Sequence, residues 1–245
     1  MANFKISALL AAMLSLGLSA CNDSNDEAAA PPAAEEATPA SIQLVRIGAY
    51  ESGVFGASAA EIPAFDAGSQ RLFVVNAEAG ELDVLDLSDP AKPEKIGSIS
   101  THSLLPGSEV NSVAVHQGIV AVAVQAADKT EPGKVAFYKA SDLSPVSAVD
   151  VGALPDMLTF TPDGKTVLAA NEGEPNEGYQ IDPEGSVSII DISNIQQPAA
   201  KTAGFKAWDS RRQELLDAGV RIFGPDIAQY ADVAGKGIQA VAVSK

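Results

Sequence analysis

One eight-residue pattern occurs three times in this chain at an almost constant spacing. The copies are Leu82-Asp-Val-Leu-Asp-Leu-Ser-Asp89, Val135-Ala-Phe-Tyr-Lys-Ala-Ser-Asp142 and Val187-Ser-Ile-Ile-Asp-Ile-Ser-Asn194, and their first residues lie 53 and 52 positions apart. A fixed period of this size is typical of repeat architectures, in which each unit buries its apolar face against its neighbour. The repeat therefore predicts an all-β protein, a β-propeller of four-stranded blades.

Each repeat unit reads as four short strands separated by turn residues. The strand-like runs are 61–66, 71–75, 82–87 and 95–99 in the first unit, 110–115, 119–124, 134–138 and 146–151 in the second, and 156–160, 166–170, 186–192 and about 200–205 in the third. Short runs of β-branched residues bounded by Gly, Pro, Asn and Asp are strand signals, and a unit of about 45–50 residues has the length of a propeller blade. A β-sandwich would also have short strands, but it does not explain copied units.

The repeat is cut short at the C-terminal end of the chain. Three units, about 60–100, 110–151 and 155–205, are followed by Ile238-Gln-Ala-Val-Ala-Val-Ser244, which matches the innermost strand of a fourth unit. Because propellers close with about four to eight blades, we expect an incomplete ring and a longer natural protein. Residues 206–237 read as an insertion, in which Asp209 or Ser210 caps a short helix that ends near Ala218 at Gly219.

The first 21 residues have the features of a lipoprotein signal peptide. Lys5 provides the positive start, residues 6–18 form an apolar stretch too short to span a bilayer, and Leu18-Ser-Ala-Cys21 resembles a bacterial lipobox. We expect lipidation of Cys21, which would attach an exported protein to a bacterial membrane, facing the periplasm or the cell surface. Plain secretion is the alternative. Residues 22–41 are rich in Ala, Pro and Glu, which predicts a flexible tether before the folded part at 42–245.

The net charge of −16 restricts the partners. The 16 Lys and Arg residues are scattered among 32 Asp and Glu, so we do not expect nucleic acid binding, which needs clustered basic residues. A cationic partner, whether a metal ion, a basic protein or a polyamine, fits this balance better. The acidic residues can also serve solubility alone.

The repeat places polar residues at one equivalent position of the innermost strands. When these strands are superposed on Phe65, Val115, Phe160 and Val243, the position four residues earlier is polar each time. It is occupied by Glu61, Asn111, Asp156 and Gln239. Equivalent positions of innermost strands surround the central channel of a propeller, so these oxygens are candidate ligands for Ca²⁺. Alternatively, they cap strand ends and bind water.

A second acidic cluster lies in the long loop between two strands of the third unit. The loop, residues 171–185, has candidate oxygen ligands for Ca²⁺ at Glu172, Glu174, Asn176, Asp182 and Glu184. Its spacing does not fit the EF-hand pattern, and a solvated acidic loop is the alternative.

Motifs for catalysis are missing from the sequence. There is no Gly-x-Ser-x-Gly, no His-Glu-x-x-His and no Gly-rich phosphate loop. The two histidines, His102 and His116, are expected to be structural or exposed. The sequence therefore favours a binding or interaction module, for an unidentified protein or small-molecule ligand, over an enzyme.

Several longer runs resemble one known family. They are Arg46-Ile-Gly-Ala-Tyr-Glu-Ser-Gly-Val-Phe55, Gln70-Arg-Leu-Phe-Val-Val-Asn76, Val110-Asn-Ser-Val-Ala-Val115, Gly152-Ala-Leu-Pro-Asp-Met-Leu-Thr-Phe-Thr-Pro-Asp-Gly164, Ala170-Asn-Glu-Gly-Glu-Pro175 and Gly219-Val-Arg-Ile-Phe-Gly-Pro225. Over roughly 44–245, the chain resembles the choice-of-anchor I proteins, which are exported YVTN/WD40-like propellers, also labelled mesenchyme-specific cell surface glycoprotein-like. The resemblance implies a propeller held at the cell surface by one of several kinds of anchor.

The resemblance also implies an alternative function, and at one position the chain differs from the family pattern. Some members look to be labelled alkaline phosphatase, which implies a metal-dependent phosphoesterase in which Glu61, Asp156 and the acids of 172–184 hold the metals. No phosphatase nucleophile is visible in the chain. Where the family tends to have Glu-Pro-Glu-Tyr-Ile, this chain has Gly237-Ile-Gln-Ala-Val, with Gln239 in place of a carboxylate. This difference puts the fourth member of a channel metal site in doubt.

Overall fold

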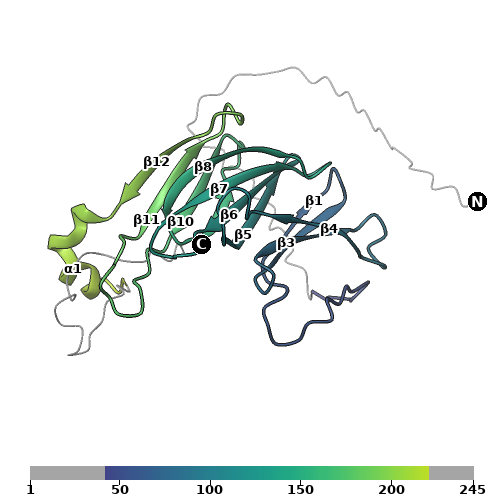
Figure 1. Cartoon of the computed structure of the whole chain (residues 1–245), viewed down its shortest axis with the longest axis horizontal. Coiled ribbons are helices and arrows are strands. Elements are labelled where there is room, and N and C mark those ends of the chain that lie inside the picture. The colour runs from purple at the N-terminus through teal and green to yellow at the C-terminus, as the bar shows by residue number, and fades with distance from the viewer. Residues whose placement is uncertain (1–41, 221–245) are drawn as a thin grey trace, which may run out of the picture. The chain divides into compact units, whose positions relative to one another are not determined.

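The computed structural model describes residues 42–220, which contain three four-stranded antiparallel sheets. The first sheet consists of β1 (Pro63–Asp66), β2 (Arg71–Asn76), β3 (Glu81–Asp86) and β4 (Glu94–Ser100). The second consists of β5 (Glu109–His116), β6 (Ile119–Gln125), β7 (Pro132–Lys139) and β8 (Pro145–Ala153). The third consists of β9 (Pro155–Phe160), β10 (Thr166–Asn171), β11 (Ser186–Asp191) and β12 (Ala199–Gly204). In each sheet the strands pair in chain order (Figure 1).

These sheets are the predicted propeller blades. All twelve predicted strands are present in the predicted order, and the all-β propeller fold is confirmed. The signal peptide with Cys21, the tether at 22–41 and the fourth-unit strand at 238–244 lie outside the described residues.

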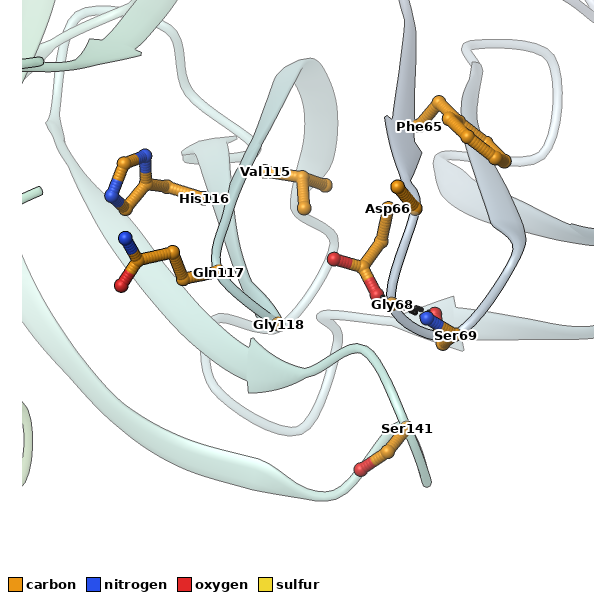
Figure 2. Close-up of a pocket in the computed structure, with 10 residues that line it drawn as sticks. Phe65, Asp66, Gly68, Ser69, Val115, His116, Gln117, Gly118 and Ser141 are labelled. Atoms are coloured by element: carbon orange, nitrogen blue, oxygen red, sulfur yellow. Dashed lines mark hydrogen bonds between the residues drawn. The ribbon is translucent and has the colours of Figure 1, made fainter. Parts of the chain in front are cut away.

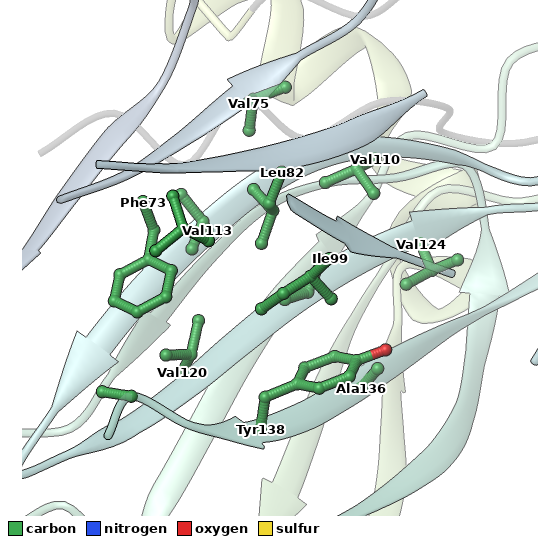
Figure 3. Packing of buried hydrophobic residues seen from close by; sticks show 13 residues of the cluster. Phe73, Val75, Leu82, Ile99, Val110, Val113, Val120, Val124, Ala136 and Tyr138 are labelled. Atoms are coloured by element: carbon green, nitrogen blue, oxygen red, sulfur yellow. The ribbon is translucent and has the colours of Figure 1, made fainter. Parts of the chain in front are cut away.

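Neighbouring blades pack face to face through two apolar layers. The innermost strand β5 contacts β1, β2 and β3 of the first blade, and β9 contacts β5, β6 and β7 of the second. Between the first two blades, Phe73, Val75 and Leu82 are fully buried in a cluster with residues of the second blade, as Figure 3 shows. Because each large apolar side chain contributes about 1.5–3 kcal/mol when fully buried, these layers supply much of the stability of the fold.

The last position of the repeated octapeptide has a local role in the turn that follows. The side-chain oxygen Oδ1 accepts a backbone N–H two residues later in all three blades: Asp89 from Ala91 at 3.1 Å, Asp142 from Ser144 at 2.9 Å, and Asn194 from Gln196 at 3.3 Å. Asp and Asn make such turns because their short side chains reach their own backbone two residues on. The repeat therefore marks the turn between the third and fourth strands of each blade.

A short helical segment follows β12. A 3₁₀ helix, η1 (Lys206–Arg211), continues into α1 (Arg212–Asp217), which ends before Gly219 as predicted, and Gly219 has the left-handed conformation, with φ of 84°. The predicted cap is wrong, because Asp209 and Ser210 lie inside η1, and η1 has no side-chain cap. Among residues 42–220, no helix is long and apolar enough to span a bilayer.

Candidate functional site

The predicted polar positions coincide with irregularities in the innermost strands. Asn111 is skipped in the pairing of β5 with β6, and Asp156 is skipped in the pairing of β9 with β10. In the first blade, Val75 accepts a hydrogen bond from the N–H of Glu61 and donates one to the carbonyl of Ile62. All three positions therefore have a β-bulge, an extra residue that re-aims a side chain and is common next to functional sites.

Asn111 joins two of these bulges. Its amide Nδ2 donates to the backbone carbonyl of Pro155 in the next blade at 3.1 Å and to Oε1 of Gln125 at 2.9 Å. Asn111 therefore fixes the backbone beside Asp156, and its Nδ2 has one structural partner in its own blade and one in the next.

The long loop brings further carboxylates to the same end of the third blade. Because β9 and β10 are antiparallel, Asn171 at the end of β10 pairs with Pro155 at the start of β9. The N–H of Glu172 then donates to the carbonyl of Leu154 at 2.8 Å, so the chain stays beside β9 as the loop begins. Gly173, with φ of 64°, allows the two arms of the loop to approach, since a Cβ there would lie 2.6 Å from the backbone carbon of Glu184.

Four carboxylates interact at this end, and we name Glu61, Asp156, Glu172 and Glu174 the acidic cluster. Burial raises the pKa of Asp156, and the negative charges of Glu174 and Glu61 raise it further. Burial also raises the pKa of Glu172, as do Asp156 and Glu174, whereas Lys129 acts in the opposite direction. Asp156 and Glu172 are half-buried, so solvent screens this repulsion only in part.

Lysines from other parts of the chain hold the acidic loop in place. Lys129, in the β6–β7 loop of the second blade, pairs with Glu174 at 2.6 Å, and Lys206 of η1 pairs with Glu184 at 3.0 Å. Within the loop, Oδ1 of Asn176 accepts the backbone N–H of Gln180 at 2.9 Å. Three of the predicted loop ligands thus have structural partners.

The structure brings together some of the predicted ligands and separates others. Glu61, Asp156, Glu172 and Glu174 form the acidic cluster, whereas Glu184 pairs with η1 and Gln239 lies outside the described residues. Asp182 is half-buried in the same loop. Among residues 42–220, no three His, Cys, Asp or Glu side chains are arranged to hold a metal ion.

Two contributors to this region were not predicted from sequence. Lys129 has no motif that links it to a loop 45 residues later, so only the fold places it against Glu174. Asn171 is 1% exposed, and its Nδ2 donates to the hydroxyls of Ser186 at 3.0 Å and Ser188 at 2.9 Å, while its Oδ1 has no partner. A sequence signal for Asn171 existed, because Asn76 ends the second strand of the first unit in the same way and is also buried.

A cavity of about 510 Å³ lies at the opposite end of the innermost strands, between the β1–β2 and β5–β6 turns (Figure 2). Its lining includes Asp66, Ser69 and His116. Oδ2 of Asp66 accepts the backbone N–H of Ser69 at 2.8 Å and its hydroxyl at 2.7 Å. The ring of His116 points away from Asp66 in Figure 2 and stacks on Phe160, with ring centroids 5.5 Å apart. These residues stabilise turns and blade packing rather than forming a nucleophile–base pair.

The family assignment rests on the match to a family model. The model of the choice-of-anchor I domain matches residues 61–237, which include all three blades. The chain belongs to this family. Membership implies a cell-surface or exported β-propeller module. No curated protein sequence matches the chain.

Solved structures with a similar arrangement are distant in sequence. A putative 6-phosphogluconolactonase from Bacteroides fragilis matches with 15% identity and a TM-score of 0.45, over 60% of this chain and 40% of that chain. A putative 6-phosphogluconolactonase from Bacteroides uniformis matches with 14% identity and a TM-score of 0.44, over 61% and 40%. Kuenenia stuttgartiensis hydrazine synthase matches with 19% identity and a TM-score of 0.43, over 59% and 37%. The chain spans less than half the length of each of these structures.

Proposed function

We propose that this choice-of-anchor I chain is a membrane-anchored propeller module that binds a positively charged group at the acidic cluster. The observation that carries the proposal is the negative charge gathered around the half-buried carboxyls of Asp156 and Glu172. Beside burial, Glu174 and Glu61 raise the pKa of Asp156, and Asp156 and Glu174 raise the pKa of Glu172. Lys129 lowers the pKa of Glu172. A bound cation relieves this repulsion, so the cluster favours cationic ligands.

The fold presents the carboxylates of the acidic cluster to a ligand from several elements. Glu61 and Asp156 lie at bulges of separate blades, and Glu172 and Glu174 lie on a loop that pairs with Lys129 and Lys206, so two blades and one loop present the carboxylates together. Ca²⁺ is one candidate ligand, because carboxylate oxygens are its preferred partners, but it would have to draw the carboxylates together, since no three of the described ones are arranged to hold a metal ion. An organic cation, such as a polyamine or a basic side chain of a protein partner, is the other.

Calorimetric titration of the folded module with CaCl₂ and, separately, with spermidine tests the proposal at constant ionic strength. We expect heat of binding with at least one of them. The double variant Asp156→Asn/Glu172→Gln should weaken that binding at least about tenfold, because about 1.4 kcal/mol of lost interaction corresponds to a factor of ten. Comparison of the two titrations identifies the class of cation.

The matched control is Asp191→Asn. Asp191 is an exposed acid at the other end of β11, where it pairs with Thr166 at the start of β10. This control should bind as the wild type does. If neither cation binds, or if the control loses as much affinity as the double variant, the acidic cluster is not the binding site.

We also propose that lipidated Cys21 attaches the module to the membrane. The support is the lipobox-like Leu18-Ser-Ala-Cys21 together with the exported nature of the family. In a bacterial host, the wild-type chain should incorporate labelled palmitate and partition into the detergent phase, and Cys21→Ser should do neither. Incorporation of the label by Cys21→Ser, or its absence from the wild type, would contradict this anchor.

A further inference from the structure

The face that each blade turns toward the next has the same four positions in all three blades. Two of these positions are on the second strand and two are on the third, and the strand register makes them equivalent. They are Phe73, Val75, Leu82 and Val84 in the first blade, Ala121, Ala123, Val135 and Phe137 in the second, and Leu168, Ala170, Val187 and Ile189 in the third. We name each set an apolar tetrad.

The third tetrad differs from the others only in what covers it. All four members of the first and second tetrads are fully buried, at 0% exposure, against the blade that follows. In the third blade, Leu168, Ala170 and Val187 are half-buried, and Ile189 is 41% exposed. The third tetrad is therefore a blade interface without a described partner among residues 42–220.

The innermost strand of the following blade covers part of each buried tetrad. The buried residues of β5 in the first interface are Val110 and Val113, and the equivalent residues of β9 in the second are Pro155 and Leu158. Apolar residues three apart share one side of the strand because the bulge residue, Asn111 or Asp156, stands between them.

The same spacing recurs in residues 238–244. Ile238 and Val241 are apolar and three apart, and Gln239 occupies the bulge position between them. A regular strand would instead need its apolar residues two apart to cover one face. The sequence of this segment therefore matches the irregular pattern of β5 and β9, including the residue that makes the bulge.

We propose that residues 238–244 of the chain cover the third tetrad, with Val241 seated between Leu168 and Ala170. Val241 then takes the place that Val113 and Leu158 take in the two described interfaces. In this arrangement the side chain of Ala242, one residue further, would lie on the opposite side of the strand. Gln239 joins the bulge positions of Glu61, Asn111 and Asp156, next to the acidic cluster.

Cysteine pairing in the full chain tests this proposal. Cys21→Ser removes the single natural thiol. In that background, Val241→Cys is combined with Leu168→Cys and, in a second variant, with Ala170→Cys, and each is oxidised at low protein concentration. We expect an intramolecular disulfide in at least one pair, seen as a loss of two free thiols by mass spectrometry. Two pairs are used because one pair alone can have unfavourable geometry.

The matched control moves one cysteine by one residue. Ala242→Cys combined with the same partners should give disulfide at least about fivefold less readily, because its side chain is on the other side of the strand. Circular dichroism and the melting temperature establish that each variant is folded. Equal yields for positions 241 and 242, no disulfide in either pair, or a disulfide that forms only between two chains would overturn the proposal.

Discussion

The turn glycine Gly164 shows how one residue couples a turn to blade packing. Gly164 ends the Thr161-Pro-Asp-Gly turn with φ of 67°, and its N–H donates to the carbonyl of Thr161 at 2.8 Å. A Cβ at this position would lie 2.3 Å from Nε2 of His116 in the preceding blade. Sequence analysis recognised the turn, but the close approach of His116 depends on the fold.

Gly164→Ala should destabilise the protein by about 1–3 kcal/mol, because it combines a left-handed backbone with a collision between blades. For a domain of this size, each 1 kcal/mol lowers the melting temperature by about 2–4 °C, which thermal unfolding will measure. Gly204→Ala is the control, since no atom lies within 4 Å of a Cβ there. Equal melting temperatures for the two variants would contradict this role of Gly164.

Asp156→Asn should stabilise the protein at neutral pH. The folded state raises the pKa of Asp156 above its ordinary value of 3.8, so the native protein holds this proton more tightly than the unfolded chain does. The contribution of Asp156 to stability is therefore greatest below pH 3.8 and is lost as the pH rises through the raised pKa.

The variant removes that loss, so its melting temperature should exceed that of the wild type at pH 7, and the gain should disappear near pH 3.8. Melting curves over this pH range measure it. Asp191→Asn should show no gain, because a backbone hydrogen bond from Ser193 lowers the pKa of Asp191. A gain for Asp156→Asn that is the same at every pH would contradict the electrostatic explanation.

At the scale of elements, the β10–β11 loop depends on a lysine from another blade. Lys129→Ala removes the ion pair with Glu174, which should increase amide hydrogen exchange across residues 172–185 by up to about fivefold, the effect of about 1 kcal/mol for an exposed pair. It should also raise the pKa of Glu172 further, because Lys129 lowers it. Lys165→Ala, in the β9–β10 turn, should change neither quantity, and a loop equally protected without Lys129 would show that the ion pair is not needed.

The order of the strands was predictable from the sequence because it depends on local contacts. Much of the candidate site was not predictable, because it depends on contacts between blades. The octapeptide and its Asp or Asn at position eight fix a turn through contacts two residues apart, so sequence alone located the strands on both sides. Superposing the repeats also found Glu61, Asn111 and Asp156 as equivalent positions. Their bulges, and the pairing of Glu174 with Lys129, depend on register and on contacts between blades, which a single sequence does not encode locally.

At the scale of the whole molecule, the blades have two distinct ends. The acidic cluster occupies one end, where β9 begins and β10 ends, and the cavity lined by Asp66 and His116 occupies the other. The first end gathers charge from the first and third blades and is fixed by a lysine of the second. The binding function we propose therefore belongs to the assembled propeller rather than to one blade.

Carboxyl titration by NMR tests the shared field of the acidic cluster most directly. We predict that Asp156 and Glu172 titrate above their ordinary values of 3.8 and 4.5, and that Glu172 titrates lower in Asp156→Asn. Glu61→Gln should lower the pKa of Asp156, because Glu61 raises it from the first blade. Ordinary pKa values for both carboxyls, unaffected by either substitution, would contradict a common acidic site built across the blades.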